Sequence, residues 1–142
     1  PKNVEVIIGT PVQELMDFCG GFTDEPGKVL YGGPMMGNCI ADLSQPILKN
    51  NNAVLAFSKK AAQLPKATNC IHCGRCTNAC PLGLSAKEIV QAYNDGDVEL
   101  LQKLNADLCM SCGTCSFVCP AKRPLAPSIA LAKIMMKNGG KK

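Results

Sequence analysis

The sequence predicts an α+β fold of two successive parts: a small mixed module over residues 1–58 and a helical domain over residues 67–138. Three observations support this division. Short β-type runs separated by Gly, Pro and Asn fill the first part, apolar residues recur with helical spacing in the second, and one cysteine motif occurs there twice. Residues 59–66, which are mostly polar and include Pro65, are expected to form a linker.

The first module is expected to consist of strands at residues 4–8, 28–31 and 54–57 with one helix among them. Thr10 is the expected N-cap of that helix, and Pro11 and Gln13 fit the first helical position and a capping box. The chain starts at Pro1 without an initiator methionine, which we interpret as a cut through a longer polypeptide. The order predicts a β-grasp module, with room left for a first strand before Pro1. The apolar face of the helix is expected to hold Val12, Leu15, Met16 and Cys19, and Gly20-Gly21 are expected to end it.

The second domain is expected to be helical, because no strand pattern occurs between Thr68 and Lys137. Ser85 and Glu88 predict a capping box at the start of one helix, and Asp97 is expected to cap the next. The later helices are predicted with Leu100, Leu101 and Leu104 facing inward, and with a last helix that opens at Pro127 and Ser128 and runs to about Lys137.

The motif C-x2-C-x2-C-x3-C-P begins at Cys70 and again, 39 residues later, at Cys109. This spacing is typical of [4Fe–4S] ligation, in which the fourth cysteine of one motif binds the cluster of the other motif. Gly74 and Gly113 stand where a side chain would crowd the cluster or the turn. The predicted ligands are Cys70, Cys73, Cys76 and Cys119 for one cluster, and Cys109, Cys112, Cys115 and Cys80 for the second.

Other uses of the ten cysteines fit their spacing less well. Disulfides are disfavoured because eight of the ten are crowded into two short segments and no secretion signal precedes them. Zinc sites separate their C-x2-C pairs by a longer loop, which favours iron–sulfur clusters here. Clusters that serve structure rather than electron transfer remain an alternative.

Several further residues leave two interpretations open. Cys19 and Cys39 are interpreted as structural thiols, with an exposed loop thiol as the alternative for Cys39. His72, the only histidine, lies between two predicted ligands and is expected to tune a cluster rather than bind it. Arg75 and the pair Lys122-Arg123 either stabilise a reduced cluster, dock an acidic partner, or form a solvated surface.

The composition excludes several functions. Two clusters of about −2 each would bring the formal charge of +4 to about zero, so the basic residues indicate compensation rather than nucleic-acid binding. No apolar run could insert in a membrane, and no P-loop or Ser/His/Asp set is present. The segment at residues 32–37, Gly-Gly-Pro-Met-Met-Gly, predicts a tight turn rather than a phosphate loop.

The order of this Gly-Gly-Pro-Met-Met-Gly segment, Cys-Ile-His-Cys-Gly-Arg-Cys and Ser-Cys-Gly-Thr-Cys-Ser-Phe-Val-Cys-Pro closely resembles the C-terminal half of the RnfC family. These are electron-input subunits of ion-translocating ferredoxin:NAD oxidoreductase complexes. The resemblance implies an SLBB-type β-grasp module and an α-helical dicluster ferredoxin domain. It also implies that FMN and NADH bind an upstream Rossmann-like domain outside this chain.

The resulting hypothesis is an electron relay with two [4Fe–4S] clusters and no catalytic residues of its own. The resemblance implies redox protein partners, either membrane complex subunits or a ferredoxin, and a cytoplasmic location at the inner face of the cell membrane. It also allows a soluble electron supply for proline reductase or cobalamin reduction. The alternative from another class is a ligand- or partner-binding module that the clusters stabilise.

Overall fold

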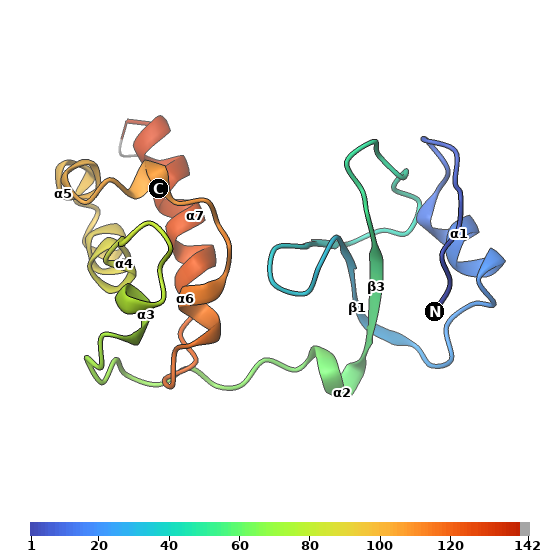
Figure 1. Ribbon diagram of the computed structural model, residues 1–142, viewed down its shortest axis with the longest axis horizontal. Helices are drawn as coiled ribbons and strands as arrows, with labels where there is room; N and C mark the ends of the chain where they lie inside the picture. Colours follow the sequence, from blue (N-terminus) through green and yellow to red (C-terminus); the bar gives the residue numbers. More distant parts are fainter. Residues whose placement is uncertain (140–142) are drawn as a thin grey trace. The chain divides into compact units, whose positions relative to one another are not determined.

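The computed structural model describes residues 1–139. The chain divides into two compact units, Pro1–Leu64 and a second unit that begins at Pro65 (Figure 1). Each unit has its own cluster of buried apolar side chains. The two are therefore described separately.

The first unit contains a three-stranded antiparallel sheet in the order β2-β1-β3. β1 (Pro26–Tyr31) pairs with β2 (Asn38–Ile40) and with β3 (Val54–Ser58), so that Val29 stands opposite both Ile40 and Ala56. The strands expected at residues 28–31 and 54–57 are confirmed, and β2 was not predicted. Val12, Val29, Ile40 and Ile47 form the small core beside this sheet.

Residues 32–37 form a tight turn that joins β1 and β2, as expected. Gly37 donates its N–H to the carbonyl of Gly33 (2.8 Å). A Cβ on Gly37 would lie 2.4 Å from that carbonyl oxygen and 2.6 Å from the one of Tyr31. Only glycine fits this close approach of two backbone segments.

The helix α1 (Val12–Phe18) begins in a different way from the prediction. Pro11 rather than Thr10 is the N-cap, and Gln13 donates its side chain to Asp17 (2.9 Å) instead of closing a capping box. The N–H groups of Val12 and Gln13 donate to the carbonyls of Gln45 (3.0 Å) and Leu43 (2.9 Å). A neighbouring loop thus satisfies the donors that a cap would have served. The helix ends at Gly20-Gly21 as predicted, with φ of 104° and 76°.

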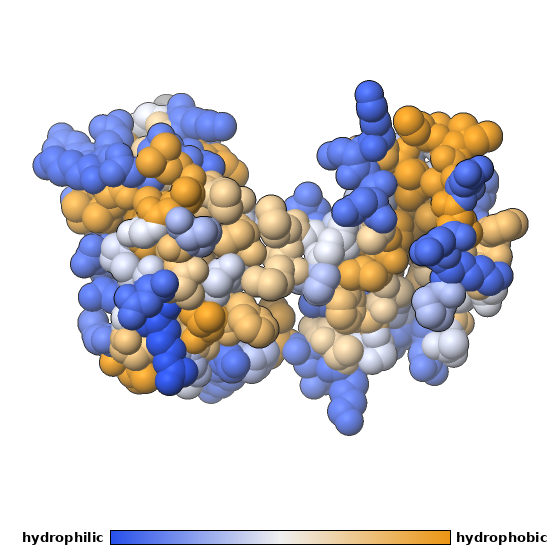
Figure 2. All heavy atoms as spheres, viewed as in Figure 1, coloured by the Kyte–Doolittle hydropathy of each residue, from blue (hydrophilic) through white to orange (hydrophobic). Residues whose placement is uncertain are grey.

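The expected strand at residues 4–8 is not formed. Within the part of the chain that the structure describes, this segment joins no ladder, and Ile7 and Ile8 are 82% and 62% exposed. The upper right of Figure 2 shows apolar residues gathered over this N-terminal segment. A β-type composition without a neighbouring strand leaves the segment as irregular backbone.

The stretch expected as a linker begins with a helix. α2 (Lys59–Ala62) follows β3 directly, and Ser58 accepts a hydrogen bond from the N–H of Ala61 (3.3 Å). The helix lies close on β1, because a Cβ on Gly27 would be 2.7 Å from both the Cβ of Ala62 and the Cα of Lys59. Residues 59–62 therefore belong to the first unit, and irregular backbone starts at Gln63.

The second unit is helical throughout its described part, with no strand between residues 65 and 139. This confirms the expectation of a helical domain. α4 and α7 pack against each other, and α5 packs against both. The elements are α3 (Arg75–Asn78), α4 (Ala86–Asp95), α5 (Val98–Lys103), the 3-10 helix η1 (Ala106–Leu108), α6 (Thr114–Phe117) and α7 (Leu125–Lys137).

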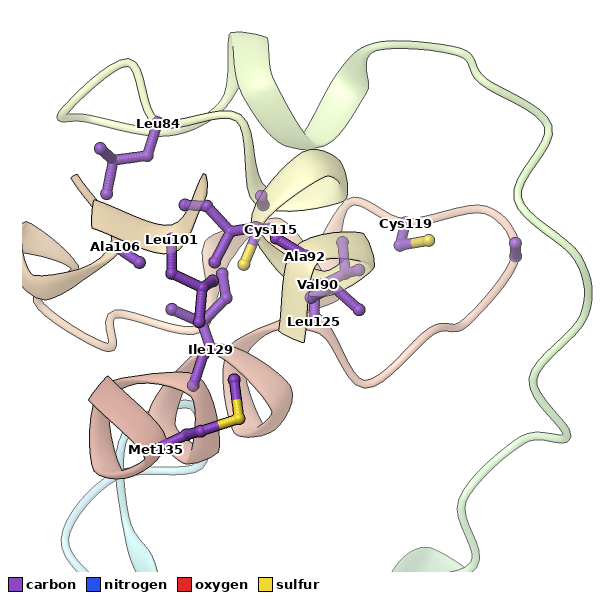
Figure 3. Packing of buried hydrophobic residues seen from close by; sticks show 14 residues of the cluster. Leu84, Val90, Ala92, Leu101, Ala106, Cys115, Cys119, Leu125, Ile129 and Met135 are labelled. Atoms are coloured by element: carbon purple, nitrogen blue, oxygen red, sulfur yellow. The ribbon is translucent and has the colours of Figure 1, made fainter. Parts of the chain in front are cut away.

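The core of this unit lies between these helices (Figure 3). Ile89, Leu101, Ile129 and Met135 are its largest fully buried side chains. Leu101 faces inward as predicted, but Leu100 is 39% exposed and does not. Burying four large aliphatic side chains contributes roughly 1.5–3 kcal/mol each, which is substantial for so small a unit.

Helix starts in this unit are partly local and partly tertiary. Asp97 caps α5 as predicted, since its carboxylate accepts from the N–H of Leu100 (2.8 Å). Ser85 is the N-cap of α4, although its side chain makes no capping bond within residues 1–139. α7 begins at Leu125, two residues before the expected Pro127, where Ser116 accepts from the N–H of Ala126 (2.8 Å).

Candidate metal centre

The two cysteine motifs repeat in backbone conformation as well as in sequence. His72 and Ser111, which hold the same motif position, both adopt left-handed backbone with φ of 55° and 57°. Gly74 and Gly113 are also left-handed, with φ of 72° and 80°. Two left-handed residues on either side of a cysteine curl each motif into a tight loop, and glycine makes the second of them inexpensive.

A short helix follows each loop in the same register. The N–H of Ala79 donates to Arg75 (2.9 Å), and its counterpart Val118 donates to Thr114 (3.0 Å). The correspondence continues to Gly83 and Lys122, both left-handed with φ of 65° and 53°. α4 and α7 then begin at positions that the 39-residue offset of the repeat also relates.

This repeat places the cysteines around two cavities. The first cavity, of about 250 Å³, is lined by Cys70, Cys73 and Cys76 of one motif together with Cys119 of the other. The second cavity, of about 20 Å³, is lined by Cys109, Cys112, Cys115 and Cys80. Each cavity thus meets three cysteines of one motif and the fourth cysteine of the other.

The two cavities differ in their other lining residues. His72, Lys87, Glu88, Gln91 and Arg123 reach the first cavity, and the Nζ of Lys87 lies 3.3 Å from Nδ1 of His72. The second cavity is lined mostly by apolar side chains. Those from its two ends include Leu82, Leu84, Met110 and Ile129.

Exposure follows the same difference. Residues 71–75 of the first loop are all exposed, whereas residues 112–115 of the second loop are half-buried or buried. Figure 3 shows Cys115 within the hydrophobic core and Cys119 toward its edge. Burial raises the pKa of the Cys115 thiol, because the thiolate loses its hydration.

Hydrogen bonding acts in the opposite direction at Cys112. Its Sγ lies 3.3 Å from Oγ1 of Thr114, and the Thr114 hydroxyl and N–H lower the pKa of this thiol by stabilising the thiolate. The thiolate is the form that binds iron. Lys133 of α7 also supports this loop, since its ammonium donates to the carbonyl of Cys109 (2.8 Å).

The donors fit a cluster better than a single ion. Among residues 1–139, no three His, Cys, Asp or Glu side chains converge closely enough to hold one metal ion. The cysteines stand around a space instead, and a [4Fe–4S] core accepts four thiolates arranged in that way. All ten cysteines lie in the described part of the chain, and each is a free thiol.

The remaining predicted residues lie apart from one another. Arg75 and Lys122 line an open groove with Phe117, which is 74% exposed. Cys39 is exposed and Cys19 is half-buried, and both belong to the first unit.

The sequence prediction missed Lys87, Glu88 and Gln91, which α4 carries to the first cavity, and also Thr114 and Lys133. Thr114 had a signal, because it lies between two ligands. The residues of α4 had a weaker one, since their helix starts directly after the motif.

Comparison with known proteins agrees with this division. Residues 66–123 match a family profile described as a 4Fe-4S dicluster domain, and residues 1–38 match an SLBB domain. The fold and the site thus define a protein that joins an SLBB module to a 4Fe-4S dicluster domain.

Three relatives identify the family. The RnfC subunit of the ion-translocating oxidoreductase complex of Rhodobacter capsulatus is 48% identical over 135 residues, which cover 94% of this chain and 26% of that protein. The corresponding subunit of the Na(+)-translocating ferredoxin:NAD(+) oxidoreductase complex of Acetobacterium woodii is 44% identical over 94% of this chain and 30% of its own length. The one from Methanosarcina acetivorans is 39% identical over 97% of this chain and 31% of its own length. The chain belongs to the RnfC family, and it spans about a quarter to a third of these relatives.

Within residues 1–139, no helix combines the length and the apolar character needed to cross a membrane.

Proposed function

We propose that this chain holds two [4Fe–4S] clusters and relays single electrons between them. Cys70, Cys73, Cys76 and Cys119 would hold one cluster at the first cavity, and Cys109, Cys112, Cys115 and Cys80 the other at the second. The observation that carries this proposal is the crossed lining of the two cavities, which matches the ligand exchange typical of two-cluster ferredoxins.

When bound, each cluster supplies a one-electron redox centre. The protein's part is to hold and separate these centres. The left-handed loops fix three thiols around each cavity, and the short helices α3 and α6 deliver the fourth thiol to the neighbouring cavity. Apolar side chains keep water from the second cavity.

The crossed arrangement also keeps the two centres close. Cys76 and Cys80 serve different cavities but are only four residues apart, which is roughly 6 Å of rise in a helical backbone. The same holds for Cys115 and Cys119. Two such bridges favour electron exchange between the sites over a purely structural use of the metal.

The proposal extends to partners outside this chain. The relative from Acetobacterium woodii is named as part of a ferredoxin:NAD(+) oxidoreductase complex. We infer that electrons come from a flavin and NADH site in a part of the whole protein beyond this chain. Partner subunits of a membrane complex, or a ferredoxin, would exchange them with the clusters on the cytoplasmic side. A soluble electron supply for proline reductase or cobalamin reduction is the alternative use of the same relay.

Anaerobic reconstitution followed by iron and sulfide analysis tests the proposal. We expect about eight iron and eight sulfide per chain, the content of two [4Fe–4S] clusters. EPR spectra after dithionite reduction should show the interaction of two neighbouring paramagnetic centres. Stoichiometric zinc, or iron without sulfide, would contradict it, and clusters that resist reduction would favour a structural platform instead.

A further inference from the structure

The environments of the two cavities are unequal in ways that affect the charge of anything they hold. The first cavity opens beside residues 71–75, all of which are exposed. The second is narrower and is surrounded mostly by apolar side chains, beside a loop that is largely buried. Water and polar groups therefore reach the first site more easily than the second.

The charged side chains add to this difference. Lys87 and Arg123 line the first cavity and are both half-buried, whereas the one carboxylate that lines it, Glu88, is exposed and better screened by solvent. The contact between Lys87 and His72 (3.3 Å) directs a polar pair to the rim of this cavity. No charged side chain other than the cysteines lines the second cavity in the described part of the chain.

One cation does lie near the second site. The ammonium of Lys133 binds the carbonyl of Cys109 (2.8 Å), behind the loop rather than in the cavity. Its charge is therefore partly spent on a backbone dipole. This cation reduces the difference between the sites but leaves the contrast in solvent access.

Reduction adds one negative charge to a centre that is already anionic. An apolar, buried site opposes this added charge because it removes hydration, while exposure, cations and N–H donors favour it. Solvent exposure and polar contacts are among the factors that set the potential of a cluster.

We propose that the cluster at the first cavity has the higher reduction potential of the two, set by its exposure and by Lys87 and Arg123. An electron shared between the sites would then pass from the second cluster, which is oxidised, to the first, which is reduced, and rest beside the exposed loop. A partner that takes electrons from this chain would collect them there. The inference depends on the proposed function, because it requires both clusters.

An EPR-monitored redox titration of the reconstituted protein tests it. We expect two separate one-electron midpoints. The double variant Lys87→Gln, Arg123→Gln should lower the upper midpoint and leave the lower one in place. A tenfold fall in the reduced-to-oxidised ratio at fixed potential corresponds to 59 mV for one electron, and we expect a shift of about this size.

Two further variants make the result independent of the folding of the double variant. Glu88→Gln removes an exposed charge and should raise the upper midpoint, the opposite sign. Lys103→Gln removes an exposed cation of α5 that lines neither cavity, and should move neither midpoint.

The inference is overturned if the charge changes at the first cavity move the lower midpoint, or if the two midpoints coincide and shift together. Iron and sulfide analysis of each sample separates this outcome from failure of the proposed function. A protein with eight iron and eight sulfide but inverted midpoints keeps its relay and loses only the assigned order.

Discussion

At the scale of single residues, the cysteines that cross between motifs decide how the site is built. Cys119 belongs to the second motif in the sequence, yet it lines the first cavity, and Cys80 is exchanged in the same way. An arrangement in which each motif binds its own cluster would leave both of these thiols in the wrong cavity.

Replacing the two crossing cysteines should therefore affect the opposite motifs. We expect Cys119→Ala to damage the cluster held by Cys70, Cys73 and Cys76, and Cys80→Ala to damage the one held by Cys109, Cys112 and Cys115. The EPR signal that survives in each variant identifies the intact site, by its response to Glu88→Gln at the first cavity.

Cys39→Ala is the matched control, because Cys39 is an exposed thiol of the first unit. It should leave iron content and both signals unchanged. If each crossing variant perturbed only the cluster of its own motif, the crossed assignment would be wrong.

The residue scale also shows where local sequence is a sufficient guide. The eight predicted ligands follow from spacing alone, and so does the capping of α5 by Asp97, because a cap needs only its own first turn. Lys87 and Arg123 reach the first cavity through the packing of the helices around it, which spacing does not reveal.

Neighbouring leucines on α5 give a second test at this scale. Leu101 is fully buried and Leu100 is 39% exposed, so the two differ in burial but hardly in sequence position. We expect Leu101→Ala to lower the free energy of unfolding by about 2–5 kcal/mol, because it leaves a cavity in the core. Leu100→Ala should cost far less.

Denaturant unfolding of the cluster-loaded protein, followed by far-UV circular dichroism, measures both changes. Equal losses for the two variants would mean that α5 is not packed on α7 through Leu101.

At the scale of elements, tertiary contacts override several local signals. The predicted Thr10 cap is replaced by carbonyls of Leu43 and Gln45, which a local pattern cannot reveal. β2 spans only three residues, too few for an alternating pattern, and the apolar run at residues 4–8 has no strand beside it. The helices of the second unit were easier to predict because their periodicity is internal.

The contact between α2 and β1 makes a sharp element-scale prediction. A Cβ on Gly27 would lie 2.7 Å from backbone and side-chain atoms of α2, whereas a Cβ on Gly33 would meet nothing within 4 Å. We expect Gly27→Ala to lower the free energy of unfolding of the first unit by about 1–3 kcal/mol, as overpacking does.

Gly33→Ala is the control and should change stability little, since its φ is not left-handed. Thermal or denaturant unfolding monitored by NMR signals of the sheet follows the first unit by itself. A neutral Gly27→Ala would show that α2 moves freely away from β1.

At the scale of the whole molecule, the two units differ in what holds them together. The first has a core of Val12, Val29, Ile40 and Ile47 and needs no metal to form its sheet. In the second, buried Cys115 and Cys119 belong to the hydrophobic core and are also predicted ligands. Packing and ligation thus share residues in one unit only.

Removal of iron should consequently unfold the units unequally. Metal sites that are built during folding contribute their binding free energy to stability, so an iron chelator under anaerobic conditions should destabilise the second unit. We expect loss of helical circular dichroism with the NMR signals of β1–β3 retained. Reconstitution with iron and sulfide should restore the helices. Simultaneous loss of the sheet would show that the first unit depends on the second, and an unchanged helical spectrum would show that hydrophobic packing alone maintains the cysteine loops.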